Sequence, residues 1–188
     1  MGLSLWKAIT GLINDTTYRT ARVDASTHSL QVVDYAHHEI HSGSAYVVSY
    51  NADVGSGANL DVLIVTPNTT AWAHMLLNLA GENELLATLY EAATVSAAGT
   101  ALTAYNHNRN SGNTAAVVIT HTPTVTGTGT AIWRRIGGSG KTVGGEARND
   151  AEVILKQNTT YLLRLTNNGV GTGWINVELD WYEHTDKN

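Results

Sequence analysis

The densest group of side chains able to do chemistry is the pentapeptide His37-His38-Glu39-Ile40-His41. A zinc-protease helix needs two residues between its glutamate and its second histidine, and here only Ile40 stands between them. On a strand, side chains two residues apart share one face. His37, Glu39 and His41 are therefore weak candidates for metal ligands if a fourth ligand comes from elsewhere in the chain.

We favour a structural interpretation of the same histidines. In cupin-type metal sites, two histidines that are two residues apart are followed by a glutamate. Residues 42–52 of this chain contain no carboxylate that could take this place. We therefore expect no metal here, and we expect His37, His38 and His41 to form a polar contact between subunits. Because imidazoles titrate near neutral pH, such a contact would respond to pH.

The segment Gly137-Gly-Ser-Gly-Lys-Thr142 matches the end of a phosphate-binding loop. The full motif needs a glycine where Arg135 stands, followed by a helix whose first turn holds the phosphate. The sequence after Thr142 begins Val-Gly-Gly, which is a poor helix start, so we predict a hairpin loop. The chain also lacks the Gly-x-Ser-x-Gly nucleophile motif and all cysteine. We expect neither a cofactor nor an enzymatic activity.

Carboxylates and tryptophans offer two weaker signals. The pairs Glu82 with Glu84 and Glu178 with Asp180 have the spacing of neighbours on a strand face, where such pairs are usually solvated. Trp133 and Trp174 are candidates for stacking on a sugar, because an aromatic ring offers an apolar face with a polar edge. Trp181 lies on the apolar side of its predicted strand, so we predict that it belongs to the core.

Composition limits the classes of protein to consider. The chain has 188 residues, of which 43% are hydrophobic and 14% charged, and its net charge is −5. This acidic balance argues against nucleic acid as the main partner. No apolar run reaches the length of a membrane span, and no secretory signal is recognisable, so we expect a soluble protein made in the cytoplasm. The low charge favours a surface that packs against other subunits.

Alternation of apolar and polar residues predicts the elements that must position these groups. Turn signals rich in Gly, Asn and Pro separate the alternating runs, and no long amphipathic helix intervenes. Residues 71–91 also have helix propensity. The pattern predicts an all-β fold, an antiparallel β-sandwich or jelly roll of about ten strands spanning residues 23–188. The predicted strands are 28–35, 45–50, 59–66, 71–79, 84–92, 115–121, 130–136, 151–156, 160–166 and 175–181.

Residues 1–22 differ from the rest and form a separate N-terminal arm in this interpretation. Within residues 3–14 the apolar side chains follow a helical spacing rather than an alternating one. A helix of this length is marginal in water and needs a surface on which to bury its apolar face. We expect this arm to dock on a partner; the alternative is that it packs on its own domain as a terminal brace. Its docking residues would be Leu5, Trp6, Ile9, Leu12 and Ile13.

Several stretches resemble jelly-roll structural proteins of tailed bacteriophage virions, in particular capsid decoration proteins. The resemblance runs from about Asp24 to His184, so it leaves out the arm. The stretches that carry it are Leu30–Gly43, Thr66–Trp72, Tyr105–Ser111, Leu155–Tyr161 and Gly173–His184.

The resemblance implies a homotrimer on the capsid surface of a virion, bound to the major capsid protein and assembled in the host cytoplasm. It supplies no catalytic residues, and it implies no nucleic-acid or membrane partner. A tail or fibre component and a glycan-binding or receptor-binding module are the alternatives. A cupin-like metalloprotein that uses the histidine cluster is a further, weaker one.

Overall fold

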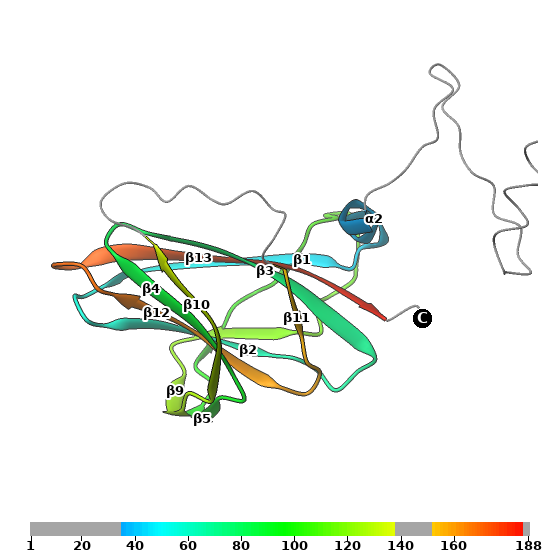
Figure 1. The fold of residues 1–188 in the computed structure, drawn as a ribbon. Coiled ribbons are helices and arrows are strands. Elements are labelled where there is room, and N and C mark those ends of the chain that lie inside the picture. Colours follow the sequence, from blue (N-terminus) through cyan, green and yellow to red (C-terminus); the bar gives the residue numbers. More distant parts are fainter. Residues whose placement is uncertain (1–34, 138–151, 186–188) are drawn as a thin grey trace, which may run out of the picture. The chain divides into compact units, whose positions relative to one another are not determined.

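The computed structural model describes residues 35–137 and 152–185, and Figure 1 shows their arrangement. These residues form one helix, α2 (Tyr35–Ser42), and a series of β-strands. The longer strands are β1 (Ala45–Val54), β2 (Asn59–Val65), β3 (Ala71–Gly81), β4 (Leu85–Glu91), β10 (Thr130–Gly137), β12 (Thr160–Asn167) and β13 (Gly173–Thr185). The shorter strands are β5 (Thr94–Ala97), β6 (Thr100–Ala101), β7 (Tyr105–Asn106), β8 (Val118–His121), β9 (Thr124–Gly127) and β11 (Val153–Leu155). No helix of the described residues is long and apolar enough to cross a membrane.

The strands build an antiparallel β-sandwich, as the sequence predicted. A five-stranded sheet has the order β11-β3-β13-β1-β7, and a six-stranded sheet has the order β10-β4-β12-β2-β8-β6. β5 and β9 form a separate pair. Between the sheets, β1 contacts β2 and β13 contacts β12, so the edge strands β11 and β10 lie on the same side of the sandwich.

Successive long strands alternate between the two sheets. β1 and β3 belong to the five-stranded sheet, whereas β2 and β4 belong to the six-stranded sheet. The same alternation returns from β10 to β13. As a result, the last strand β13 lies between β1 and β3, paired with β1 from Ala45 opposite Tyr182 to Val54 opposite Gly173. Residues from both halves of the chain therefore meet on one face.

Alternation along the strands explains which side chains fill the core. On β13, Ile175, Val177, Leu179 and Trp181 point between the sheets and are buried, as the sequence predicted. Matching inward residues come from every long strand except the edge strand β10, whose Trp133 is half-buried against the core. The core residues with essentially no exposure include Val62, Ile64, Met75, Leu89, Tyr161, Leu163, Leu165, Val177 and Leu179.

A second, smaller apolar cluster lies on the outer face of the six-stranded sheet. Leu63 of β2 and Leu162 of β12 point away from the main core, because each follows or precedes an inward residue. Both are nevertheless buried, together with Ala93. Val95 of β5 and Val125 of β9 pack against them, so the β5–β9 pair covers this part of the sheet.

Most of the predicted strands are confirmed, with small changes at their ends, and residues 71–91 are strands rather than helix. Four short strands, β5, β6, β7 and β9, were not predicted. A strand was expected at residues 28–35. Residues 28–34 lie outside the described residues, and Tyr35 begins helix α2. The N-terminal arm, with Leu5, Trp6, Ile9, Leu12 and Ile13, also lies outside the described residues.

Candidate functional site

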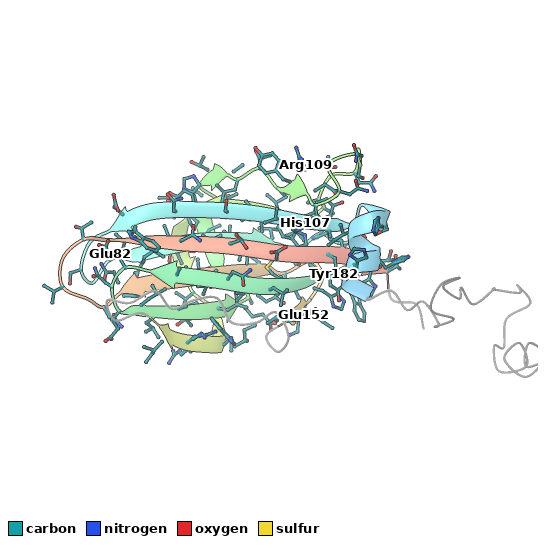
Figure 2. The ribbon with its side chains drawn as sticks, turned by 90° about the horizontal axis from the view of Figure 1, so that it is seen from above. Glu82, His107, Arg109, Glu152 and Tyr182 are labelled. Carbon is teal, nitrogen blue, oxygen red and sulfur yellow. The ribbon has the colours of Figure 1, made fainter. Side chains whose placement is uncertain are left out.

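Most histidines of the described residues gather at one end of the five-stranded sheet. Among the described residues, every histidine except His121 belongs to α2, to this sheet or to the residue after β7. α2 contacts β1 and β13 at this end. Figure 2 shows His107, Tyr182 and Glu152 near the helix, whereas Glu82 lies at the opposite end of the sheet. We call the end of the five-stranded sheet that contacts α2, together with α2 itself, the histidine face.

His74 is the centre of the polar cluster on the histidine face. Its Nδ1 atom lies 2.5 Å from Oε1 of Glu152, and the Tyr182 hydroxyl donates to the same oxygen over 2.9 Å. The His74 and Tyr182 rings stack with their centroids 4.6 Å apart. Only 9% of the His74 surface is exposed, although the residue points out of the sandwich. Its neighbours therefore fix both the position and the orientation of the imidazole.

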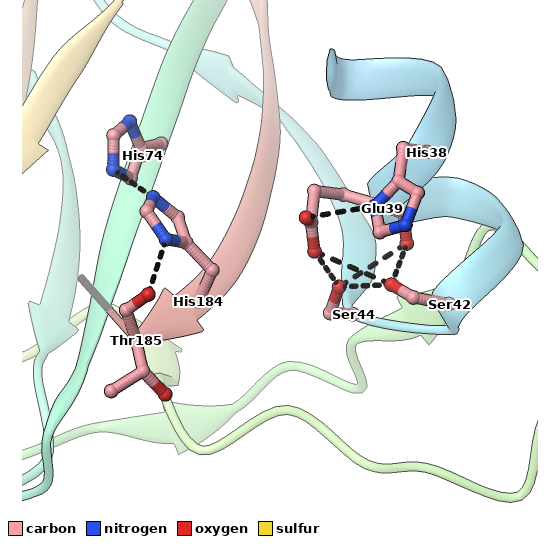
Figure 3. A network of polar contacts seen from close by, with 7 residues as sticks. All are labelled: His38, Glu39, Ser42, Ser44, His74, His184 and Thr185. Atoms are coloured by element: carbon pink, nitrogen blue, oxygen red, sulfur yellow. Dashed lines mark hydrogen bonds and ion pairs between the residues drawn. The ribbon is translucent and has the colours of Figure 1, made fainter. Parts of the chain in front are cut away.

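His184 extends this cluster toward the end of β13. Its Nε2 atom lies 2.7 Å from Nε2 of His74, and its Nδ1 atom lies 3.0 Å from the carbonyl oxygen of Thr185, as Figure 3 shows. The two imidazole rings have centroids 4.4 Å apart. Each ring therefore directs Nε2 at the other ring and Nδ1 at an oxygen acceptor.

Strand geometry brings these residues together. β3 lies between β11 and β13, and His74 stands opposite Ile154 on one side and Tyr182 on the other. Glu152 and His184 each lie two residues from one of those partners, so they point to the same face of the sheet. The sequence analysis missed this cluster. The polar side of the alternating run at 175–181 continues through Tyr182 and His184, but the pairing with β3 is not visible in the sequence.

A second pair of histidines lies on α2. His37 and His41 are one helical turn apart, with Nε2 atoms separated by 3.0 Å. Residues two apart on a helix point about 200° away from each other. Glu39 consequently faces away from the pair and is buried. His37, Glu39 and His41 would share one face only on a strand, and the segment is helical. Only the two histidines share a face.

The buried Glu39 carboxylate fixes the turn between α2 and β1. The Ser44 hydroxyl donates to Oε2 of Glu39, the Ser42 hydroxyl donates to the Glu39 carbonyl oxygen over 2.8 Å, and His38 places Nδ1 3.2 Å from Oε1 (Figure 3). A catalytic triad needs the serine hydroxyl to donate to the imidazole, whereas both of these hydroxyls donate to oxygen atoms of Glu39. At this turn, Gly43 has a φ of 75°, which glycine adopts without strain. The arrangement is therefore a helix end.

The loop after β7 is tied to the same end of the sheet. Nε2 of His107 lies 2.5 Å from Oδ1 of Asp180, which is only 8% exposed. The expectation of a solvated pair formed by Glu178 and Asp180 is thus wrong for Asp180. Glu178 accepts a hydrogen bond from Asn78 of the neighbouring strand. Glu178 therefore belongs to a cross-strand contact, and Asp180 to a contact with the loop after β7.

Several other predicted residues have clear positions. Trp181 is buried in the core, as predicted. Trp174 is 43% exposed and Trp133 is half-buried, so their proposed sugar contact stays a prediction. His37, His38 and His41 are exposed, and their role in a subunit contact stays a prediction as well. Gly137 ends β10, and the rest of the loop to Thr142 lies outside the described residues.

Comparisons of the chain with models of protein families, with curated proteins and with solved structures found no match. Its chemistry must therefore be inferred from the site itself. On the histidine face, imidazole nitrogens lie in pairs with carboxylate oxygens or with each other. Within residues 35–137 and 152–185, no three or more His, Cys, Asp or Glu side chains are grouped so as to hold a metal ion.

Proposed function

We propose that the chain is a structural protein of a bacteriophage virion, which decorates the head by binding the major capsid protein and stabilises the shell. The observation that carries this proposal is the order of the long strands. The orders β1-β13-β3-β11 and β2-β12-β4-β10, in which successive strands alternate between two antiparallel sheets, support an eight-stranded jelly roll. This fold recurs in viral capsid proteins, lectins and cupins. It agrees with the resemblance that the sequence carries.

Because one fold serves many functions, the surface must supply further support. The edge strands β10 and β11 expose Ile132, Ile136 and Ile154, at 43%, 71% and 53% of their surface. We call this side of the sandwich the isoleucine edge. Edge strands also present unpaired backbone groups, so an apolar edge favours contact with another chain. A protein that works by packing against a shell needs such a surface.

The proposal includes a homotrimer in which His37, His38 and His41 lie at the subunit contact. Their exposure on one short helix is what a contact made by histidines would require. Light scattering of the purified chain tests the trimer, and a monomer at micromolar concentration would contradict it. If the trimer persists when all three histidines are replaced by alanine, the histidines of α2 have no role in the subunit contact.

The location is tested by mass spectrometry of purified phage particles that carry this coding sequence. A decoration protein should be present in amounts similar to the major capsid protein, and cryo-electron microscopy should place it on the head. A few copies per particle would place it in the tail instead. Its absence from particles would overturn the proposal.

Binding to the shell is tested with capsids that lack the protein. Ile136→Glu places a charge on the isoleucine edge, and Val170→Glu is the matched control at a loop residue that is 98% exposed. We expect Ile136→Glu to weaken binding at least tenfold, and Val170→Glu to leave it unchanged. Deleting residues 1–16 should also weaken binding without changing the melting temperature. Wild-type binding by both altered proteins would contradict the proposed docking surfaces.

A further inference from the structure

The hydrogen bonds of His74 and His184 determine where each ring carries its proton. A neutral imidazole has one N–H group and one lone pair. Nδ1 of His74 faces the Glu152 carboxylate over 2.5 Å and the Tyr182 hydroxyl over 3.1 Å, and that hydroxyl donates to Glu152. Nδ1 of His184 faces the Thr185 carbonyl oxygen. The carboxylate and carbonyl oxygens only accept hydrogen bonds, so both Nδ1 atoms donate to them. The lone pairs of the neutral rings then lie on the two Nε2 atoms, which face each other over 2.7 Å.

Two lone pairs that face each other need a cation between them. We propose that His74 and His184 form a binding site for a divalent transition-metal ion of the zinc class, coordinated by both Nε2 atoms. Imidazole nitrogen is a preferred ligand of Zn²⁺, Ni²⁺ and Cu²⁺. The proposal does not depend on the function proposed above.

The surroundings of both rings match those of metal-binding histidines. Such a histidine usually donates its second N–H group to a carboxylate or to a backbone carbonyl, which fixes the ring and raises its basicity. Glu152 has this role for His74, and the Thr185 carbonyl has it for His184. The Tyr182 hydroxyl in turn donates to Glu152 and holds the carboxylate in place. Glu152 and Tyr182 are thus positioning residues.

The distance between the ligands requires a small adjustment. With Zn–N bonds of about 2.0–2.1 Å, two nitrogens of a tetrahedral ion lie about 3.3 Å apart. The Nε2 atoms must therefore separate by roughly 0.6 Å. His184 is the second-last residue of β13 and is only half-buried, so we expect its ring to make most of this adjustment. His74 is held by Glu152, which directly precedes β11, and by Tyr182 of β13.

The pair on α2 differs in a way that matters for the test. His37 and His41 have a similar separation of 3.0 Å, but they are exposed on a helix of eight residues. They can bind added metal as well, so they must be removed to isolate the strand site. Two protein ligands leave the remaining coordination positions to water, and we expect an affinity well below that of a four-ligand structural site.

The test uses the full chain in a His37→Gln, His41→Gln background, titrated with Zn²⁺ by calorimetry. We expect one ion per chain. His184→Gln should weaken binding at least tenfold, and Glu152→Gln should weaken it 10-fold to 100-fold through loss of the ring's orientation. His121→Gln is the matched control, since His121 stacks on Tyr50 in another part of the molecule. This control should leave the affinity unchanged.

NMR of the histidine ring nitrogens gives a second measurement that needs no further substitution. Zn²⁺ should shift the Nε2 signals of His74 and His184 together, while the Nδ1–H signals persist. Absence of binding at millimolar Zn²⁺, or equal affinity in the His184→Gln protein, would overturn the proposal. In that case the cation between the two rings is a shared proton only.

Discussion

The outer faces of the two sheets differ in what contacts their side chains. On the six-stranded sheet, the β5–β9 pair covers Leu63 and Leu162 and turns part of the outer face into a second apolar cluster. On the five-stranded sheet, outward side chains are paired with one another, as in His74 with Glu152 and His107 with Asp180. The apolar side chains that the β5–β9 pair covers cannot contact another molecule. The paired polar side chains of the five-stranded sheet can still be reached by one.

This difference indicates that the covered face contributes mainly to stability and the polar face mainly to binding. Burial of apolar groups is the main favourable term in folding, whereas most hydrogen bonds and exposed ion pairs contribute little net free energy. Of the two outer faces, the covered one should therefore contribute more to the free energy of unfolding. The histidine face should contribute less, and its side chains should matter for binding.

The largest effect should come from Leu162→Ala. The side chain has no exposed surface, and its removal leaves a cavity beneath the β5–β9 pair. We expect a loss of about 2–5 kcal/mol in the free energy of unfolding, measured by urea denaturation. Val118→Ala is the control, because Val118 lies on the outer face of the same sheet and is 52% exposed. That change should stay within about 0.5 kcal/mol. Similar losses from both would show that the β5–β9 pair does not act as a cover.

Asp180→Ala tests the opposite face and should have a smaller effect. It removes the partner of His107 and leaves a partly buried imidazole without its carboxylate. We expect a loss of about 1–3 kcal/mol. Asp180→Asn keeps an acceptor oxygen and should lose less. A loss that exceeds that of Leu162→Ala would contradict the division between the two faces.

The sequence predicted the sandwich because its long strands alternate clearly, most of all on β13. It did not predict β5, β6, β7 or β9, since runs of two to four residues carry little periodicity. At His37–His41, two spacings compete. The residues fit both a strand with three groups on one face and a helix with two.

The cluster around His74 depends on a property that lies beyond local sequence. His74 lies on β3, His184 lies on β13 and Glu152 directly precedes β11, and only the register of β3 against β11 and β13 brings the three side chains together. A shift of one residue would turn His74 into the core. Single residues such as Trp181, by contrast, could be assigned to the core from the pattern of their own strand.

Alkaline pH should reveal a contribution from the core that both sheets share. Burial raises the pKa of Tyr161 to about 12, and the nearby Glu91 carboxylate acts in the same direction. The folded state therefore favours the neutral phenol. Its contribution to stability is complete below pH 10, falls as the pH rises and is lost above about 12.

Tyr161→Phe should remove part of this alkaline loss. The measurement is urea denaturation between pH 9 and 11.5, with Tyr105→Phe at an exposed tyrosine as the control for a lost phenol. Near neutral pH, Tyr161→Phe should cost about 1 kcal/mol, because the hydroxyl contacts Glu91 and the Lys156 amide. An unchanged alkaline slope would contradict the role of Tyr161.

The smallest effect should come from the ion pair on the uncovered part of the six-stranded sheet. Arg164 and Asp61 stand directly opposite each other on β12 and β2. The guanidinium donates through Nε over 2.8 Å and through a terminal nitrogen over 2.7 Å to the two carboxylate oxygens, and these hydrogen bonds raise the pKa of Arg164. Arg164→Lys keeps the charge but loses the two-pronged contact. Because both side chains are partly solvated, we expect a loss of only about 0.5–1 kcal/mol in urea denaturation, which shrinks as salt is added. A loss of several kcal/mol that does not respond to salt would show that this face depends on its polar pair as much as on its apolar cover.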